Sequence, residues 1–267
     1  MGNVRKTMRA LAVMAMLAAP VMAAARDLPA DPLKSVMWED MAERFLPGGD
    51  IVFDQRVRVM VPASAEDQFF VPVTVDATGL PGVTEIVVLA DLNPIPQVLT
   101  YRPADAEAFI AFRLKVEQAT AIRAAARTAD GVWHVGGANI DAAGGGCTAP
   151  AMAHGQPNWM ATLGETRARV WREGTDVARM TVRMRHPMDT GLADGIPAFY
   201  LSGLVVTGTD GRTLASIDIH EPVSENPTFT LKPRIDAGTR RLDVLARDSE
   251  ANNFAYSLPV KAAEVAN

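Results

Sequence analysis

The spacing of apolar residues changes along the chain. Between residues 32 and 46 an apolar side chain recurs every four residues, at Leu33, Met37, Met41 and Phe45, which predicts one amphipathic helix. Asp31-Pro32 is a typical helix start, with Asp as the N-cap and Pro at the first helical position. Leu46-Pro47-Gly48-Gly49 is a stop signal. We therefore expect a single helix over residues 32–46, packed on the first domain of the chain.

From residue 50 the period is two, which is typical of strands with one buried face. Turn signals such as the stretch from Asp76 to Gly82 separate the alternating segments. Strands are predicted around Val57–Val61, Val71–Val75, Ile86–Ala90, Ile95–Tyr101, Ala108–Val116, Thr120–Thr128 and Val132–Ile140. Short strands joined by regular turns favour a β-sandwich.

The alternation stops over residues 143–160, which are rich in Gly, Pro, Ala and Asn, and resumes after Glu165. Further strands are predicted around Met180–Met184, Leu204–Val206, Ile217–Ile219, Phe229–Leu231, Leu242–Ala246 and Tyr256–Val260. The pattern therefore predicts an all-β protein with two sandwiches, over about 50–142 and 163–261. The corresponding domains are expected to comprise residues 26–142, which include the helix, and residues 161–267. Residues 143–160 form the linker between them.

The first 25 residues have the pattern of an export signal. Arg5, Lys6 and Arg9 form a basic region, Ala10–Ala19 an apolar run, and Ala23-Ala24-Ala25 a cleavage site of small residues. The apolar run is too short to cross a bilayer, which takes about 20 residues. Arg5-Lys6 is not a twin arginine, so we expect a Sec-type signal peptide over 1–25 and a periplasmic protein.

Charge narrows the choice of partners. The chain carries a net charge of −5, and residues 1–25 contain three basic and no acidic side chains. Their removal leaves a net charge of −8. Nucleic acid is an unsuitable partner because binding it requires a basic footprint, and an anionic membrane surface is unsuitable for the same reason. No membrane association is expected after signal cleavage.

The linker carries the only cysteine of the chain, Cys147, directly after Gly144, Gly145 and Gly146. A glycine run behaves as a flexible coil, so we expect a mobile arm with an exposed thiol of ordinary acidity. An unpaired cysteine in an exported protein implies an intermolecular partner or a free reactive thiol. The alternative is a small buried hydrophobic side chain, since free cysteines are often buried.

Other chemistry has weaker signals. Cys147, Met152 and His154, with a second histidine from His134, His186 or His220, would make a copper site. Cys147 and a histidine would make a hydrolase pair. Both need a rigid frame, which a glycine run opposes. His186 to Gly191 is interpreted as a shaped loop, His220 as a solvated strand residue and His134 as partly buried. No phosphate-binding loop, dinucleotide fingerprint or zinc spacing is present, so no cofactor, metal or catalytic residue is expected.

The second half contains a recognisable set of motifs. His186-Pro187-Met188-Asp189-Thr190-Gly191, Glu225-Asn226-Pro227-Thr228-Phe229 and Leu242-Asp243-Val244 followed by Asp248 resemble the Z subunit of the Sox thiosulfate-oxidising system. The first half resembles its Y subunit, with a helix, a sandwich and a glycine-rich stretch carrying one cysteine. The order Y then Z is similar to the fused SoxYZ-like carriers associated with quinoprotein dehydrogenases.

This resemblance implies two immunoglobulin-like sandwiches and a periplasmic, non-enzymatic carrier. It implies that Cys147 holds the sulfur adduct, that Gly144, Gly145 and Gly146 form its arm, and that separate sulfur-oxidising or quinoprotein dehydrogenase-associated enzymes act on the cargo. One departure concerns the arm. In the family the Y chain ends with Gly-Gly after the cysteine, whereas here Thr148-Ala149-Pro150 comes next and the chain continues. Both ends of the arm are therefore fixed, which shortens its reach into a narrow active site.

These features support two functional hypotheses. The first is a covalent carrier of a sulfur-containing group on Cys147, as in thiosulfate oxidation. The second is a non-covalent binding or adaptor protein of a periplasmic quinoprotein dehydrogenase system, for which Cys147 is dispensable. A copper-binding protein is a third alternative, which metal analysis would test.

Overall fold

The computed structural model describes residues 28–261. The predicted signal peptide, residues 1–25, lies outside the described residues. Within the described part, no helix has the length and apolar character needed to cross a bilayer. One α-helix, α1 (Trp38–Phe45), precedes eight strands of the first half: β1 (Ile51–Phe53), β2 (Arg58–Met60), β3 (Val71–Asp76), β4 (Val83–Ala90), β5 (Gln97–Arg102), β6 (Ala106–Leu114), β7 (Thr120–Thr128) and β8 (Trp133–Ile140).

Two short 3₁₀ helices, η1 (Met152–Gly155) and η2 (Trp159–Thr162), lie between the halves. The second half has seven strands: β9 (Thr166–Arg172), β10 (Ala178–Met184), β11 (Leu201–Thr207), β12 (Thr213–Ile219), β13 (Thr228–Pro233), β14 (Arg241–Asp248) and β15 (Asn253–Lys261). The all-β prediction is confirmed, and β7 has the predicted bounds. The three-residue strand β1 and the seven-residue strand β9 were not predicted individually.

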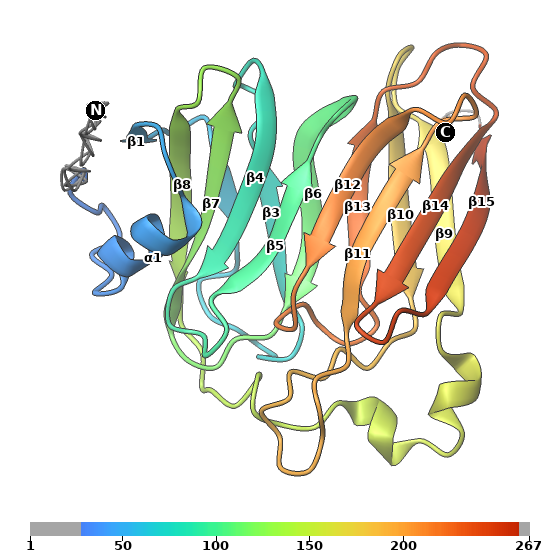
Figure 1. Ribbon diagram of the computed structural model, residues 1–267. Coiled ribbons are helices and arrows are strands. Elements are labelled where there is room, and N and C mark those ends of the chain that lie inside the picture. Colours follow the sequence, from blue (N-terminus) through green and yellow to red (C-terminus); the bar gives the residue numbers. More distant parts are fainter. Residues whose placement is uncertain (1–27, 262–267) are drawn as a thin grey trace, which may run out of the picture.

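The two immunoglobulin-like halves share both of their sheets (Figure 1). The first sheet has the order β1-β8-β7-β4-β5-β12-β11-β14-β15, and the second has the order β9-β10-β13-β6-β3-β2. The first sheet crosses between halves through the antiparallel β5–β12 pair, and the second through β13–β6. The parallel pair β15–β9 joins the sheets at one edge. The halves are therefore joined edge to edge in one two-layered sandwich.

The core reflects this arrangement. Side chains that point between the sheets form one buried cluster containing residues from both halves, such as Ile110 and Phe112 from the first and Leu231 and Val244 from the second. In β3 and β10 the buried positions alternate as predicted. β7 is buried along almost its whole length because α1 covers the other face of its sheet.

The helix is shorter than expected. It begins at Trp38, and not at Pro32, because the carboxylate of Asp31 accepts bonds from the amides of Leu33 and Ser35 in a turn. Lys34 has φ +56, a left-handed conformation that cannot continue a right-handed helix. The helix ends at the predicted place, and Trp38, Met41 and Ala42 pack against the outer side of the first sheet.

Candidate functional site: the buried cysteine at the junction

The chain from Asp141 to Pro150 forms no strand, as predicted, but it is closely packed. The amides of Gly145 and Gly146 donate to the carbonyls of Glu117 and Val116, each at 3.2 Å. A Cβ on Gly146 would lie 2.4 Å from the carbonyl oxygen of Val116. A Cβ on Gly144 would lie 2.8 Å from that of Glu117. The glycines let the arm lie directly on the chain segment just after β6.

Cys147 is buried. Only 1% of its surface is exposed, and its Sγ donates to the carbonyl oxygen of Lys115 at 3.6 Å. The expectation of an exposed thiol is therefore wrong in this conformation, and the alternative of a buried cysteine describes it. The reason is that the glycine run permits close backbone contact, which places the next residue against the core. The mobility of the arm itself remains a prediction.

Glu117 holds the cysteine segment in place. One of its carboxylate oxygens accepts bonds from the amides of Cys147, at 2.9 Å, and Thr148, at 3.2 Å. The other oxygen accepts from the Thr148 hydroxyl at 3.1 Å. From the second half, the Thr190 hydroxyl donates to the Cys147 carbonyl at 2.6 Å. Cys147 is thus held by both halves of the molecule.

Lys115 lies next to the Cys147 thiol, which bonds its backbone carbonyl. Its side chain is buried and its ammonium donates to the carbonyl of Met188 at 2.5 Å. Burial lowers the pKa of Lys115 to about 8, and nearby Cys147, Asp189 and Glu225 oppose this. Burial raises the pKa of the Cys147 thiol to about 12, with Lys115 opposing and Glu117 reinforcing the shift. Because the thiolate is the nucleophile, burial disfavours the reactive form of the docked thiol.

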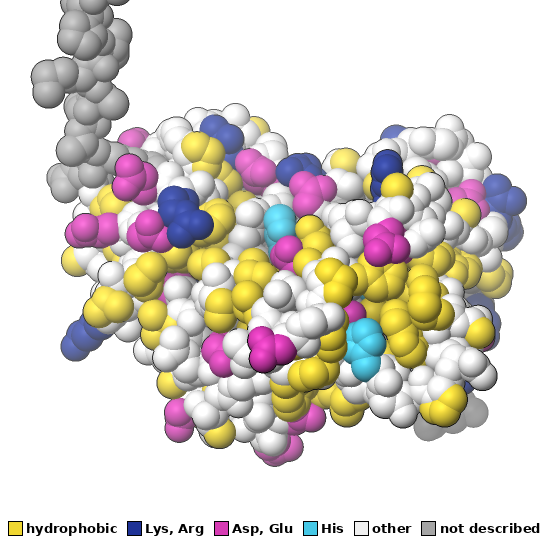
Figure 2. Space-filling view, turned by 60° about the horizontal axis from the view of Figure 1, so that its bottom comes forward, with side chains coloured by type: hydrophobic (Ala, Val, Ile, Leu, Met, Phe, Trp, Pro, Cys, Tyr) yellow, Lys and Arg dark blue, Asp and Glu magenta, His cyan; other side chains and the backbone are white. Residues whose placement is uncertain are grey.

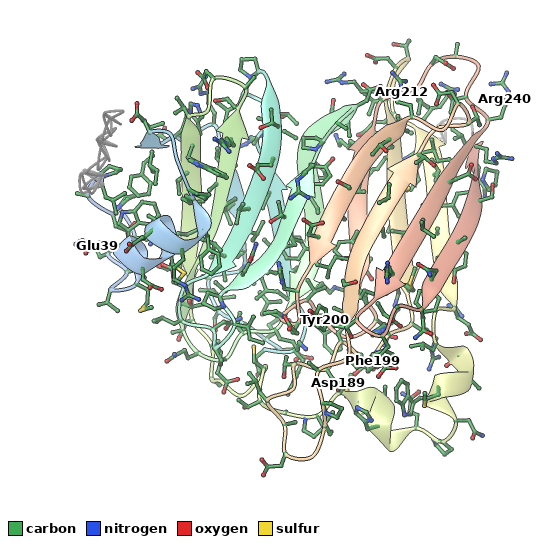
Figure 3. All side chains as sticks on the ribbon, in the orientation of Figure 1. Glu39, Asp189, Phe199, Tyr200, Arg212 and Arg240 are labelled. Carbon is green, nitrogen blue, oxygen red and sulfur yellow. The ribbon has the colours of Figure 1, made fainter. Side chains whose placement is uncertain are left out.

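The loop from His186 to Gly191 forms the other wall of the site. Met188 has φ +55 and its amide donates to Nδ1 of His186. A carboxylate oxygen of Asp189 accepts from Nε2 of the His154 ring at 2.9 Å. Figure 3 shows Asp189 and Phe199 among the loops at one end of the sandwich, opposite the end that carries Arg212 and Arg240. This motif, which the sequence indicated as a shaped loop and as part of the family resemblance, lies directly at the cysteine, because its Thr190 hydroxyl donates to the Cys147 carbonyl.

The linker after the cysteine is bonded to the second half next to the same site. The amide of Met152 donates to the carboxylate of Glu225 at 2.7 Å. His154 packs edge-on against Trp159, whose ring approaches Phe199. Figure 2 shows hydrophobic side chains gathered over this end of the molecule, with basic side chains largely at its edges. Met152, Met160 and Leu192 are among the exposed hydrophobic side chains of these loops.

The positions of the histidines and of Cys147 do not support the copper and hydrolase alternatives. Within residues 28–261, no group of three or more His, Cys, Asp or Glu side chains is arranged to hold a metal ion. The Cys147 thiol bonds a backbone carbonyl, whereas His154 bonds Asp189 and His134 bonds Asp54. His220, expected to be solvated, is half-buried just after β12. His186 is buried, and its Nε2 lies 3.8 Å from Asp248.

Three residues of this site were not predicted from the sequence. Lys115 and Glu117 come just after β6, and the charge of Lys115 inside the predicted apolar strand Ala108–Val116 was the available signal. Glu225 was noted only within a motif. The function of each depends on contacts with residues at least 30 positions away.

Comparison with known protein families gives the same division of the chain. The family described as "Sulfur oxidation protein SoxY" matches residues 42–147, and that described as "Sulphur oxidation protein SoxZ" matches residues 168–259. Together the two matches cover about three quarters of the chain. The protein belongs to the SoxYZ-like fusions, with a SoxY domain followed by a SoxZ domain. The SoxY match ends at Cys147.

No curated protein matches the chain significantly. Among solved structures, it is similar to the sulfur carrier protein SoxY from Chlorobium limicola f thiosulfatophilum, with 18% identity, a TM-score of 0.35 and coverage of 40% of this chain and 96% of that one. It is also similar to a glycosyl hydrolase family 2 member from Bacteroides cellulosilyticus, with 12% identity, a TM-score of 0.21 and coverage of 72% and 24%. A β-glycosidase from Bacteroides vulgatus has 10% identity, a TM-score of 0.24 and coverage of 76% and 24%. At these TM-scores the structural likenesses carry no conclusion about function.

Proposed function

We propose that this protein is a periplasmic covalent carrier that holds a sulfur-containing adduct on Cys147 while partner enzymes act on it. The observation that carries the proposal is that the SoxY match ends at the only cysteine of the chain, which lies where the SoxY and SoxZ halves meet. Membership of the sulfur-oxidation family supports a carrier role, and the carrier itself performs no catalysis.

The docked conformation is the resting, unloaded state in this proposal. The thiol is protonated and buried, so partner enzymes cannot reach it. The small cavity beside Lys115 measures about 20 Å³, and Cys147 is not among its lining residues. A water needs roughly 10–15 Å³ of such space, so a sulfonate group on the cysteine does not fit. Attachment of an adduct to Cys147 therefore requires the arm to move out of its docked position.

The tethering of the arm limits its reach. Asp141 is bridged to Ser64 on one side, and Met152 is bonded to Glu225 on the other. Cys147 is five residues from Met152, so an extended chain carries it at most about 17 Å from that anchor. This reach suits enzymes with a shallow or open site.

Substitution of Glu117, whose carboxylate holds Cys147 and Thr148, tests whether the arm must undock before Cys147 can react. In Glu117→Gln the carboxylate loses its charge, and hydrogen bonds to charged groups contribute about 1.5–3 kcal/mol. Since about 1.4 kcal/mol is a factor of ten, we expect Cys147 to be alkylated at least about tenfold faster in native buffer. Glu43→Gln, on the exposed side of α1, is the matched control and leaves the rate unchanged. Equal rates in both variants would contradict this role of Glu117.

The adduct itself is tested by intact mass. Protein purified from its native periplasm without reductant is expected to carry persulfide or thiosulfonate-type adducts, or a disulfide-linked dimer through Cys147. A reductant removes them, and Cys147→Ser abolishes them. A bare thiol in every preparation, together with full function of Cys147→Ser, would refute the carrier.

The burial of Cys147 favours a second candidate. A cysteine with 1% exposure also fits a packing residue in a non-covalent binding or adaptor protein of a periplasmic quinoprotein dehydrogenase system. In that case Cys147→Ser supports normal function, provided that the variant folds. The same variant therefore separates the two candidates.

A further inference from the structure

The outer face of the second sheet carries a group of arginines at the end nearest Cys147. Arg167 on β9 and Arg183 on β10 are exposed and lie directly opposite each other in the antiparallel pair. Arg169 is exposed two residues further along β9, and Arg113 is exposed near the end of β6. Like charges that face each other across a strand pair destabilise a sheet. A neutralising partner would remove this cost.

The basic residues elsewhere on this face have acidic partners. Lys232 lies 3.2 Å from Glu173, Arg179 lies 4.0 Å from the same carboxylate, and Arg58 is paired with Asp76. Within residues 28–261, by contrast, the structure has no ion pair for Arg113, Arg167, Arg169 or Arg183. The excess of positive charge is therefore confined to the part of the face nearest the cysteine, in a protein whose net charge is negative.

A cavity of about 490 Å³ opens at this place. Three arginines line it, Arg167, Arg183 and Arg185, against a single carboxylate, Glu165. Gln156 and Asn226 add polar groups to the lining. Arg185 donates to the side-chain oxygen of Gln156 at 3.2 Å. Gln156 belongs to the linker between Cys147 and β9, so one wall of the cavity is the linker itself.

We propose that this arginine face is a docking surface for an acidic patch on a partner protein. The arginines extend from β9 across β10 and β13 to β6, about 15 Å at 4.8 Å per strand. That width matches a protein surface and exceeds a single oxyanion. Guanidinium groups bind carboxylates with two parallel hydrogen bonds, which suits Asp and Glu side chains. This docking does not depend on the chemistry of Cys147.

A fluorescently labelled deca-glutamate peptide is a suitable probe, with binding measured by anisotropy at about 0.1 M salt, where the Debye length is about 10 Å. The variant is Arg167→Glu/Arg183→Glu. The matched control is Arg240→Glu/Arg247→Glu, which makes the same change in net charge at two exposed arginines in or beside β14 that have no ion pair within residues 28–261. Circular dichroism checks the fold of each, and Arg167→Ala/Arg183→Ala serves if the reversal does not fold.

We expect the peptide to bind the native protein, the Arg167/Arg183 variant to bind at least tenfold more weakly, and the control to stay within about twofold. The peptide's affinity should fall with salt. Absence of binding to the native protein, or an equal loss in both double variants, would overturn the docking surface. Stronger competition by sodium sulfate than by sodium chloride at the same ionic strength would also overturn it, in favour of a small-anion site. Because the assay does not involve Cys147, its failure leaves the carrier proposal unaffected.

Discussion

Buried ionisable side chains are concentrated at the end of the sandwich that carries Cys147. The buried ionisable side chains there are Lys115, His186, Asp189, Glu225 and Asp248. Burial lowers the pKa of Lys115 and that of His186, and such shifts cluster at functional sites. At the scale of single residues, the site is therefore expected to respond to pH.

His186 gives the clearest pH prediction. Burial lowers its pKa from 6.5 to about 4, with Asp248 opposing. Between those values the unfolded chain binds a proton that the folded protein does not, so stability falls as the pH falls from 6.5 to 4. This lowering of the pKa corresponds to about 3 kcal/mol of stability. Urea unfolding at pH 7, 5.5 and 4.5 should show this loss for the native protein.

The comparison variant is His186→Asn, which keeps an acceptor for the Met188 amide. We expect the difference in unfolding free energy between the variant and the native protein to shift in favour of the variant as the pH falls. A difference that stays constant over the whole range would show that His186 does not titrate in this way.

At the scale of elements, the arm of Gly144, Gly145 and Gly146 is a closely fitted segment and not a loose connection. Gly144 and Gly145 have φ +107 and +86, a region that side chains disfavour. Gly146 lacks a positive φ, and its requirement is space beside the carbonyl oxygens of Val116 and Gln68. Gly144 and Gly145 thus allow docking through their backbone conformation, and Gly146 allows it through its small size.

Gly146→Ala tests the docking. Its Cβ would lie within 2.6 Å of two backbone oxygens, so the arm cannot keep its docked position. We expect Cys147 in the folded variant to be alkylated almost as fast as in urea-unfolded protein. Gly155→Ala, where a Cβ meets nothing within 4 Å, is the control and should react as slowly as the native protein. A slow reaction in Gly146→Ala would mean that the arm docks in another way.

The N-terminal segment is held by a buried ion network. Arg123 on β7 binds the carboxylates of Asp31 and Asp91, with contacts of 2.6 and 2.9 Å. Its guanidinium also lies 4.7 Å from the ring centre of Trp38. The network joins the turn before α1 to the sheet. Its residues lie far apart in the sequence, and the sequence indicated only Asp31, as the N-cap of a helix.

We expect Arg123→Met to lower the free energy of unfolding by about 3–5 kcal/mol, because it leaves buried carboxylates without a partner. Urea denaturation measures this. Arg127→Met, on the same strand but about one-third exposed, should cost less than about 1 kcal/mol. Similar losses in the two variants would contradict a special role for the buried network.

At the scale of the whole molecule, the continuous sheets make the two halves one structural unit. Separating them would expose the edges of β5, β12, β6 and β13, which pair across the junction. It would also divide a single buried core. We therefore predict that both halves unfold together, since cooperative units share their packed contacts.

Hydrogen exchange resolved by mass spectrometry measures this cooperativity. The most protected amides of β4 and β7 in the first half should have the same opening free energy as those of β11 and β14 in the second. Leu231→Ala, at a buried position of the β13–β6 pair, should lower both values by a similar amount, about 2–5 kcal/mol. A loss confined to the second half would show that the halves unfold independently.

The sequence by itself determined the class of fold and the placement of most strands, because alternation records which face of a strand is buried. The strand predicted for Thr120–Thr128 has the same bounds in the structure. The motifs from His186 to Gly191 and from Glu225 to Phe229 also indicated the family. The start of the helix at Trp38 was not predicted, because the side chain of Asp31 bonds a turn and Arg123, a residue 92 positions away.

Only the tertiary structure decided the state of Cys147. A glycine run allows both a loose arm and a closely docked one, and local sequence does not distinguish them. The docked arm depends on carbonyl groups of Val116 and Glu117, the Glu117 carboxylate and the Thr190 hydroxyl, all of them distant in the sequence. Likewise, the pairs β5–β12 and β13–β6 join the two predicted sandwiches through continuous sheets. Pairing between strand edges is a property of the assembled sheets, because backbone groups of any sequence can form it.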